Sequence, residues 1–292
     1  MYKQLVYKVK ILRSLFVSDK RYLKKRFINK LGYVPNFEHP QTFNEKVTAR
    51  MIYDRCSFYG MLADKFAVRD LVIDRIGEQY LVPLIGVYQN FNEIQFEHLP
   101  HQFVLKCTHD SGSALICKNK DSFNVDKAKD KTNTSLSMNM YYRKREWHYK
   151  DIQPRIMIEN FVELYVDQET QSKITTCRVH CFENKPEFME IDITGADGIE
   201  YANIYNSSWE LQPFSVDGKQ STPIEINEPL KFTKMIELAK KLCFKYGYCR
   251  VDFLLTQEDV YFSEITLTPN AGRMVIEPKQ WDEKLGKLWK VF

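Results

Sequence analysis

Two acidic residues on neighbouring apolar segments are the clearest chemical signal in the sequence. Asp252 lies inside the segment 250–255, and Glu264 is near the end of the segment 260–265. The short polar stretch 256–259 between the segments predicts an antiparallel hairpin, in which two carboxylates on one face converge. Carboxylate oxygens are the ligands that Mg²⁺ prefers, especially when phosphates complete its shell. The pattern therefore predicts a metal site, with a pair of surface acids as the alternative.

A lysine followed by a small, hydroxyl-rich turn is the second signal. Lys106 lies near the end of the apolar segment 103–107, and the turn after it contains Ser111, Gly112 and Ser113. Small residues let backbone N–H groups approach phosphate oxygens closely, and a lysine supplies a compact positive charge. The turn is not a Walker motif, but it predicts a phosphate-binding loop.

Helices and strands that position these residues follow from hydrophobic spacing and capping signals. Expected helices cover residues 42–59, opened by a capping box of Thr42 and Glu45, then 63–76 and 229–246, the last stopped by Gly247. Expected strands cover residues 80–87, 103–107, 114–117, 156–158, 173–182, 188–193, 249–255 and 260–265. The polar stretch 195–223 is expected to be a long surface connection. Helices interleaved with mostly antiparallel strands predict an α+β fold.

A basic arm forms the N-terminal part of the sequence. Residues 1–30 carry ten basic residues and one acidic residue, a net charge of +9. Leu5, Val9, Leu12 and Phe16 follow each other at spacings of four, three and four, which predicts one stripe of an amphipathic helix. The favoured interpretation is a helix docked on its own domain. The alternative is a basic helix resting on an anionic membrane surface or on a partner protein.

Composition excludes several classes of protein. The 292 residues have a net charge of only +4, so no nucleic-acid partner is expected. No apolar run reaches the length of a spanning helix, and basic residues interrupt any signal-peptide core, so a cytoplasmic protein is expected, with the arm as its one route to peripheral membrane contact. The seven cysteines include no Cys-x-x-Cys pair, which argues against a disulfide framework and a structural zinc site.

An ordered set of motifs resembles one known family. The motifs, spread over residues 36–286, are PQTFNEK (40–46), ADKFAVR (63–69), LP (99–100), FVLKCTH (103–109), SG (111–112), PRIMIE (154–159), RVDF (250–253), EIT (264–266) and AG (271–272). They resemble the ATP-grasp superfamily, in particular its TupA-like (teichuronopeptide biosynthesis-like) branch of bacterial surface-polysaccharide loci.

That resemblance implies a fold and a division of the chain. Two α+β subdomains clasping ATP would follow a small helical region that precedes the ATP-grasp fold. The corresponding boundaries are an arm at 1–35, a pre-ATP-grasp region at 36–102, subdomain 1 at 103–158 and subdomain 2 at 159–292.

The resemblance also implies roles for single residues. Carried over by motif, Lys65 and Lys106 would hold the ATP phosphates, residues 111–113 would cover them, and Glu159 would lie at the adenine and ribose edge. Asp252 and Glu264 would hold Mg²⁺.

One position departs from the family pattern. Many ATP-grasp enzymes have Glu-x-Asn where this chain has Glu264-Ile265-Thr266, so the third oxygen ligand is open between Thr266 and Asn270, with Asn270 slightly favoured.

Three more residues complete the predicted catalytic set. Arg250 would neutralise charge, Lys173 would reach phosphate or substrate from its strand, and His109 would lie near the transferred phosphate. For Lys173 an ordinary exposed charge is an equal alternative, and for His109 a hydrogen bond within the turn.

The predicted activity follows from the family. ATP would phosphorylate a carboxylate, and an amine would attack the acyl phosphate to give an amide on a sugar acid of a capsular or other surface polysaccharide, or on its precursor. One alternative is a glycosyltransferase of polysaccharide biosynthesis, for which the sequence has no Asp-x-Asp motif, and another is a small-molecule kinase with the same nucleotide site. A third is a non-catalytic assembly factor. In this setting the basic residues 1–30 would contact the inner membrane or polysaccharide-assembly proteins.

Overall fold

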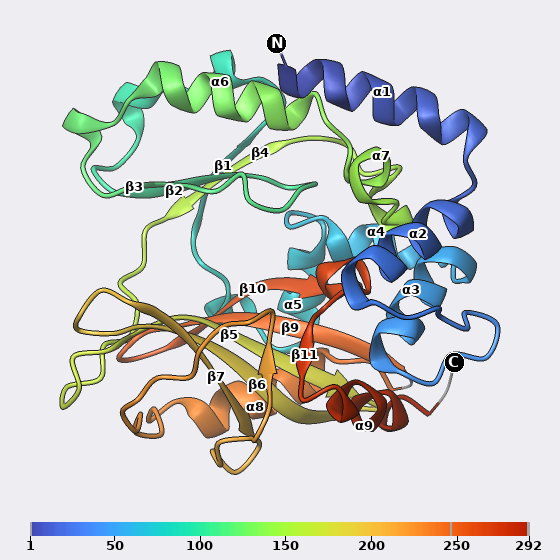
Figure 1. Cartoon of the computed structure of the whole chain (residues 1–292). Helices are drawn as coiled ribbons and strands as arrows, with labels where there is room; N and C mark the ends of the chain where they lie inside the picture. The colour runs from blue at the N-terminus through green and yellow to red at the C-terminus, as the bar shows by residue number, and fades with distance from the viewer. Residues whose placement is uncertain (1, 246, 291–292) are drawn as a thin grey trace. The chain divides into compact units, whose positions relative to one another are not determined.

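A computed structural model describes residues 2–245 and 247–290 of the chain, which divide into two compact units. Unit 1 comprises residues 1–23, 55–69 and 82–162, and unit 2 comprises residues 24–54, 70–81 and 163–292. Each unit has its own antiparallel sheet (Figure 1). The predicted region 36–102 contributes to both units, and the predicted boundary at 158/159 lies close to the junction at 162/163.

Unit 1 is built on a four-stranded sheet in the order β1-β4-β2-β3. Its strands are β1 (Leu84–Tyr88), β2 (Phe103–Cys107), β3 (Leu115–Cys117) and β4 (Ile156–Asn160). The α-helices of this unit are α1 (Tyr2–Phe16), α4 (Phe58–Ala63), α6 (Val125–Leu136) and α7 (Met140–Lys144). Phe103, Leu105, Ile156 and Ile158 share one core with Ala128 of α6, so the apolar alternation of β2 and β4 positions the polar turn that follows β2.

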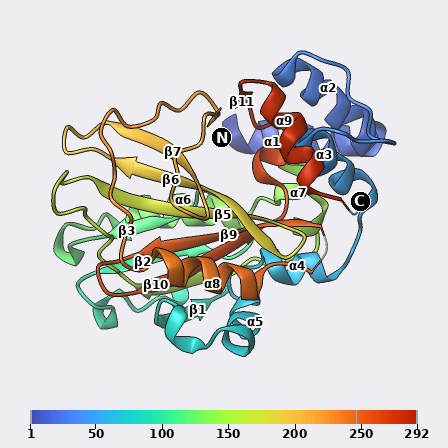
Figure 2. The ribbon, with the colours of Figure 1, turned by 90° about the horizontal axis from the view of Figure 1, so that it is seen from below.

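Unit 2 is built on a five-stranded sheet in the order β10-β9-β5-β6-β7. The strands are β5 (Lys173–Phe182), β6 (Lys185–Thr194), β7 (Glu200–Asn206), β9 (Tyr248–Leu255) and β10 (Val260–Thr266). One face carries Val179, Met189 and Val251, which are fully buried, and α8 (Phe232–Leu242) packs against this side through contacts with β5, β6 and β9 (Figure 2). The opposite face of this sheet carries the charged residues of the candidate site.

The rest of unit 2 surrounds one end of this sheet. Helix α3 (Phe43–Tyr53) packs against α9 (Gln280–Leu288), and β8 (Ser215–Val216) pairs with β11 (Ile276–Glu277). The predicted capping box is confirmed, since Thr42 accepts from the Glu45 N–H and the Glu45 carboxylate accepts from the Thr42 N–H. Helices α2 (Asp19–Leu31) and α5 (Val68–Arg75) each cross from one unit into the other.

Two predicted helices are shorter than the sequence indicated. The helix predicted for 42–59 ends at Tyr53, because Asp54 adopts an extended conformation. The helix predicted for 63–76 begins only at Val68, as α5, while Ala63 is the last residue of the preceding helix α4. Between them the Asp64 carboxylate accepts hydrogen bonds from the N–H groups of Phe66 and Ala67 at 2.9 and 3.3 Å and starts a new turn. Lys65 therefore lies in the link between helices.

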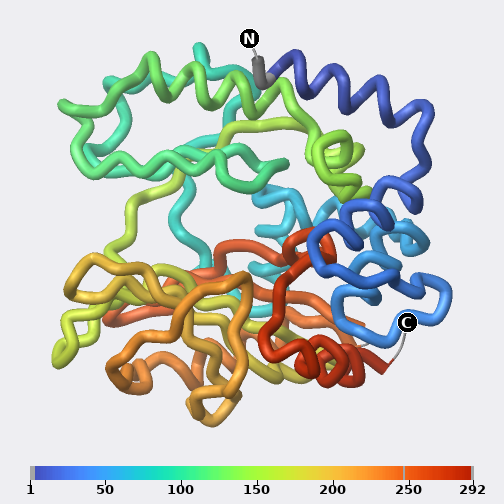
Figure 3. Tube along the Cα trace, in the orientation of Figure 1, coloured from blue at the N-terminus to red at the C-terminus, as the bar shows by residue number. Residues whose placement is uncertain are grey.

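The expected surface connection 195–223 is wrong in part. Strand β7 lies within it and pairs with β6 along its whole length, and β8 follows. Figure 3 shows the course of the chain through these residues. Asn203 obscured this strand in the sequence. Its amide is satisfied inside the fold, where it donates to the Tyr205 hydroxyl at 2.8 Å and accepts from the Thr222 N–H at 2.9 Å.

Helix α8 buries the predicted face of Met235, Leu238, Ala239 and Leu242, but it is shorter than predicted. It ends at Leu242, because Cys243 is extended, and the expected end at Tyr246 lies outside the described residues. The expected strand at 80–87 begins later, at Leu84. The remaining predicted strands are present, and the α+β fold class is confirmed.

Within residues 2–245 and 247–290, no helix is both long and apolar enough to cross a membrane.

Candidate functional site

A row of charged residues crosses the polar face of the sheet in unit 2. In register, Glu264 of β10 pairs with Asp252 of β9, Asp252 with Arg178 of β5, and Arg178 with Glu190 of β6. Strand pairing brings the two predicted metal ligands together as the hairpin pattern required. Asp252 is buried, whereas the Glu264 side chain is 30% exposed, so the carboxylate pair has one open edge.

Arg250 holds this carboxylate pair in place. Its Nε and Nη2 atoms donate to the two oxygens of Asp252 at 2.7 and 2.6 Å, and Nη2 lies 3.8 Å from Glu264. The Thr266 hydroxyl accepts from Arg250 at 3.1 Å and donates to Glu264 at 3.3 Å. Burial raises the pKa of Asp252 to about 6, against the charge of Arg250, so the carboxylate is ionised at neutral pH.

Arg178 joins two further acids that the sequence analysis did not identify. Its guanidinium donates to Glu190 at 2.9 Å and to Asp192 at 2.5 Å. Lys219, which follows β8, reaches the same acids, with its ammonium 2.6 Å from Asp192 and 3.6 Å from Glu190. Glu190 and Asp192 alternate along β6 as a strand with one polar face requires, and this period of two was the signal in the sequence.

His180 lies in the next row of the same face. It pairs in register with Arg250 and stacks on Phe188 at 4.1 Å between ring centroids, and its Nδ1 shares a hydrogen bond of 3.0 Å with the Tyr248 hydroxyl. Burial lowers the pKa of His180 to about 4, so the imidazole is neutral at pH 7. Burial alone would raise the pKa of Glu190, but the neighbouring His180 ring, 3.9 Å away, and the charge of Arg178 leave it lowered.

Asn270 and Lys173 lie outside these contacts. The Asn270 amide donates to the carboxylate of Asp217, whereas Thr266 contacts Glu264 directly, so the geometry favours Thr266 as the third oxygen near the carboxylate pair. Lys173 is the first residue of β5 and pairs with Thr194 in register. In the described part of the chain its ammonium makes no ion pair.

In unit 1, two cations converge on Glu159 from opposite sides. The Lys106 ammonium lies 2.6 Å from one carboxylate oxygen and the Arg69 guanidinium 3.0 Å from the other. All three side chains are at most 13% exposed. Lys106 lies near the end of β2, as predicted. Its partner, Glu159, is the acid that was predicted to lie at the adenine and ribose edge. Arg69 also donates to the Val82 carbonyl at 3.1 Å, so two bonds fix its orientation.

The turn after β2 is tied down by its own polar groups. Ser113 accepts from the Cys107 N–H at 2.9 Å and donates to the Asp110 carboxylate at 2.5 Å. The Lys65 ammonium donates to the Asp110 carbonyl, which brings the predicted phosphate-binding lysine to the predicted loop. Ser111 and Gly112 are exposed at the tip, and the positive φ of Gly112 (+89°) is a conformation that side chains rarely adopt.

His109 is a buried member of the same turn. Its Nε2 donates to the carbonyls of Ser135 and Met138 at 3.1 and 3.2 Å, at the end of α6, and among the described residues its buried Nδ1 has no hydrogen-bond partner. The geometry therefore shows His109 holding the turn against residues 135–138.

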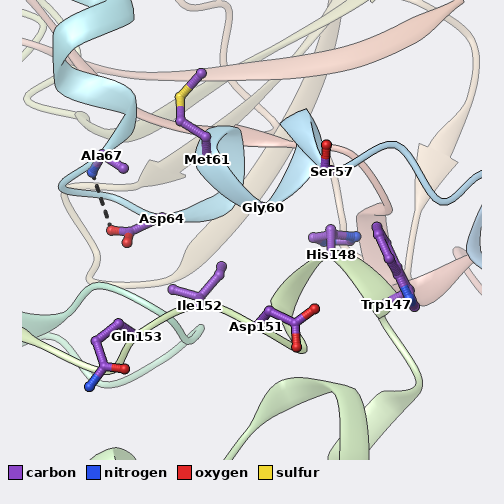
Figure 4. Close-up of a pocket in the computed structure, with 10 residues that line it drawn as sticks. All are labelled: Ser57, Gly60, Met61, Asp64, Ala67, Trp147, His148, Asp151, Ile152 and Gln153. Atoms are coloured by element: carbon purple, nitrogen blue, oxygen red, sulfur yellow. Dashed lines mark hydrogen bonds between the residues drawn. The ribbon is translucent and has the colours of Figure 1, made fainter.

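Unit 1 contains a cavity of about 290 Å³ (Figure 4). Asp64, the residue before Lys65, forms part of its wall. Trp147, His148 and Asp151 come to it from the segment after α7, and Ser57 and Gly60 come from α4 and its start. Asp64 is held by Arg155 at 2.7 Å. The cavity thus combines an indole ring with carboxylates.

A metal site made only of protein groups is not present in the described part of the chain. No set of three or more His, Cys, Asp or Glu side chains there is arranged to hold an ion. Two carboxylates with an open edge fit an ion that takes its other ligands from phosphates and water, as Mg²⁺ does.

Comparison with known proteins supports the family suggested by the motifs. The family described as TupA-like ATPgrasp matches residues 45–290. No curated protein matches the chain.

Solved structures similar to this chain include three ligases or ATP-grasp proteins. An L-amino acid ligase from Bacillus licheniformis has 11% identity and a TM-score of 0.44, over 78% of this chain and 49% of its own. A RimK domain ATP-grasp protein from Sphaerobacter thermophilus has 14% identity and a TM-score of 0.40, over 83% and 69%. A D-alanine–D-alanine ligase from Bacillus anthracis complexed with ATP has 16% identity and a TM-score of 0.37, over 72% and 56%.

This chain spans about half the length of the first of these structures. The family match alone covers most of the chain and includes both the cation pair on Glu159 and the carboxylate pair of the hairpin. The chain belongs to the TupA-like ATP-grasp family.

Proposed function

We propose that the chain is an ATP-dependent carboxylate–amine ligase. The γ-phosphoryl group of ATP is transferred to a carboxylate oxygen, which gives ADP and an acyl phosphate. The amine nitrogen then attacks the acyl carbon, the carbon–oxygen bond to phosphate breaks, and the nitrogen loses a proton. The observation that carries the proposal is the paired carboxylates Asp252 and Glu264, in register and beside Arg250, in a chain of this family.

The residues of the hairpin fit the magnesium ion that the family uses together with ATP. Asp252 and Glu264 supply two hard oxygen donors on adjacent strands, and the exposed edge of Glu264 leaves room for phosphate and water ligands. Arg250 occupies one lone pair on each Asp252 oxygen and orients the carboxylate. When bound, Mg²⁺ neutralises developing phosphate charge.

Cations of the chain have to offset the repulsion between a triphosphate and a carboxylate substrate. In unit 1, Lys65 and Lys106 are assigned to phosphate oxygens, and the exposed tip of the loop, Ser111 and Gly112, offers backbone N–H groups. Glu159 keeps Lys106 extended and pre-oriented, which lowers the entropy cost of ligand binding. In unit 2, Arg250 and Lys173 are assigned to the substrate side.

A sugar acid of a surface polysaccharide, or its precursor, is the proposed carboxylate substrate. The motifs resemble a branch of polysaccharide loci, and the cavity of unit 1 supports the assignment, because an indole ring such as Trp147 stacks on sugar rings. Asp151 beside it suits an ammonium or a hydroxyl group of the acceptor, whereas Asp64 is already paired with Arg155.

The test is a product analysis with an isotopically labelled carboxylate. Purified chain is incubated with ATP, Mg²⁺ and a panel of sugar acids and amines, and products are identified by mass. A ligase yields ADP, an amide, and inorganic phosphate that carries one labelled oxygen from the carboxylate. ADP with a stable phosphorylated product identifies a kinase, and release of a nucleotide from a nucleotide sugar identifies a glycosyltransferase; either result overturns the proposal.

Substitutions in one hairpin provide a matched control. Asp252→Asn and Glu264→Gln should lower turnover on the order of 100-fold while the fold is retained, because each amide keeps the shape and removes a charge. Asp259→Asn, in the exposed turn of the same hairpin, should leave turnover unchanged. Wild-type turnover in both carboxylate variants across a magnesium titration would rule out the metal assignment.

A further inference from the structure

The predicted apolar stripe of α1 faces away from the rest of unit 1. Leu5, Val9, Leu12 and Phe16 are 62, 57, 58 and 79% exposed. Leu15, at 74% exposure, extends the same surface. These five residues are named the apolar face of α1. The helix does dock on its own unit, as expected, but this stripe is not the face that makes the contacts.

The opposite side of α1 makes the contacts that hold the helix. The Tyr7 hydroxyl accepts from the Asn139 N–H at 2.8 Å, and its ring lies edge-on to Tyr142 at 6.5 Å between centroids. Ile11 and Ser14, four and seven residues after Tyr7, are half-buried on the same side. Because these residues repeat at helical spacing, the contacts fix which face of α1 points outward.

Positive charge surrounds the apolar face. Lys8 and Arg13 are exposed on α1, and no acidic residue precedes Asp19. That single acid is itself neutralised, because Arg145 lies 2.7 Å and Arg55 2.9 Å from its carboxylate oxygens. The outward surface of the arm therefore carries a net positive charge without an acidic counterpart.

An anionic lipid surface matches both properties. A helix with large exposed apolar side chains flanked by lysine and arginine lies in the interface of a bilayer, with its apolar side among the acyl chains and its cations at phosphate groups. A second copy of the chain would bring two basic arms together, which electrostatic repulsion disfavours. A neutral apolar partner would leave the charge unmatched.

We propose that α1 attaches this chain to anionic lipid bilayers, with Leu5, Val9, Leu12, Leu15 and Phe16 inserted at the level of the headgroups and with Lys8 and Arg13 at lipid phosphates. The helix lies on the surface and does not span it. This inference is independent of the proposed ligase activity, since it rests on the exposed face of α1 alone.

Vesicle co-sedimentation of the full chain tests the proposal. Wild type is expected to bind vesicles of phosphatidylcholine with phosphatidylglycerol at least about tenfold more tightly than vesicles of phosphatidylcholine alone, and salt should weaken the binding. Leu12→Glu should reduce binding to the anionic vesicles at least about tenfold. Leu211→Glu is the matched control, because Leu211 is 55% exposed and Leu12 is 58% exposed. This control variant should bind the vesicles as wild type does.

Two charge-reversal variants separate the electrostatic attraction to lipid headgroups from the insertion of apolar side chains. Lys8→Glu should weaken binding several-fold, whereas Lys287→Glu, an exposed lysine of α9, should not. Circular dichroism and light scattering of every variant check the fold and the oligomeric state. Equal binding by wild type and Leu12→Glu would overturn the proposal. So would a wild-type dimer that Leu12→Glu dissociates and that shows no vesicle binding, since the face would then belong to a second copy.

Discussion

Lys106 illustrates how much a single side chain depends on a partner that lies far away in the sequence. Its place near the end of a strand was visible in the sequence, but its 2.6 Å contact with Glu159 depends on the pairing of β2 with β4. The ion pair is almost fully buried, and Arg69 holds the other oxygen of the same carboxylate. Removing Lys106 therefore leaves Glu159 paired, which makes substitution at this position a clean probe of ligand binding.

Lys106→Ala should weaken ATP binding at least about tenfold, because a hydrogen bond to a charged group contributes about 1.5–3 kcal/mol. Titration calorimetry with ATP and Mg²⁺ measures the effect. Lys118→Ala, an exposed lysine just after β3, serves as the control and should bind normally. Unchanged affinity in Lys106→Ala would remove the assignment of the loop to phosphate.

His180 links pH to stability. Burial lowers its pKa to about 4, below the ordinary value of 6.5, so between these values the unfolded chain binds the proton and the folded chain does not. The contribution of His180 to the free energy of unfolding should therefore fall by roughly 3 kcal/mol as pH falls from 6.5 to 4, whereas Asp252, whose pKa burial raises to about 6, contributes with the opposite sign. Urea unfolding measured across this range checks the slope.

His180→Gln is the comparison for this pH dependence. The variant keeps a hydrogen-bonding partner for Tyr248 but has no titrating group at this position, so the difference in unfolding free energy between wild type and variant should shift against the wild type as pH falls from 6.5 to 4. Parallel pH curves for wild type and variant would show that another group sets the slope.

At the scale of elements, local signals were read correctly and signals that depend on pairing were missed. The hairpin with Asp252 and Glu264 was predictable, because a short turn between two apolar runs fixes which residues oppose each other. The cluster around Glu190 was not, because its contact with Arg178 depends on the pairing of β6 with β5, and its contact with Lys219 depends on the path of the chain after β8. The later start of the helix predicted for 63–76 was missed for a different reason. Asp64 is acceptable inside a helix by its propensity alone, and only its hydrogen bonds reveal a cap.

The capping box of α3 gives a prediction for this scale. The Glu45 carboxylate accepts from the N–H groups of Asn36, Gln41 and Thr42 at 2.9, 2.8 and 3.1 Å. Thr42→Ala should lower the free energy of unfolding by about 1 kcal/mol, and Glu45→Ala should lower it more, since three donors lose their acceptor.

Denaturant unfolding of these variants is compared with Ser57→Ala. Ser57 occupies the corresponding position before α4 but makes no capping hydrogen bond with its side chain, so its loss should change stability by less than about 0.5 kcal/mol. A Ser57→Ala effect equal to that of Thr42→Ala would show that the side-chain cap is not the source of the stability.

At the scale of the whole molecule, the cysteines report on packing in both units at once. All seven are free thiols and all lie in the described part of the chain. Six are buried, and only Cys56, before α4, is exposed. Burial raises the pKa of Cys107, Cys177 and Cys249 to about 12, so these thiols carry almost no thiolate at neutral pH.

A thiol reagent added to the native chain should therefore modify one cysteine quickly and the other six only at the rate at which the fold opens. In denaturant without a reductant, all seven should react at once, because no disulfide has to be broken first. Cys56→Ser should abolish the fast native phase and leave six slow thiols. The absorbance of the chromophore that the reagent releases gives the number of thiols that react in each phase. A second fast thiol in the native chain would mean that one of the two cores is open to solvent, and fewer than seven thiols in denaturant would mean that a disulfide had formed.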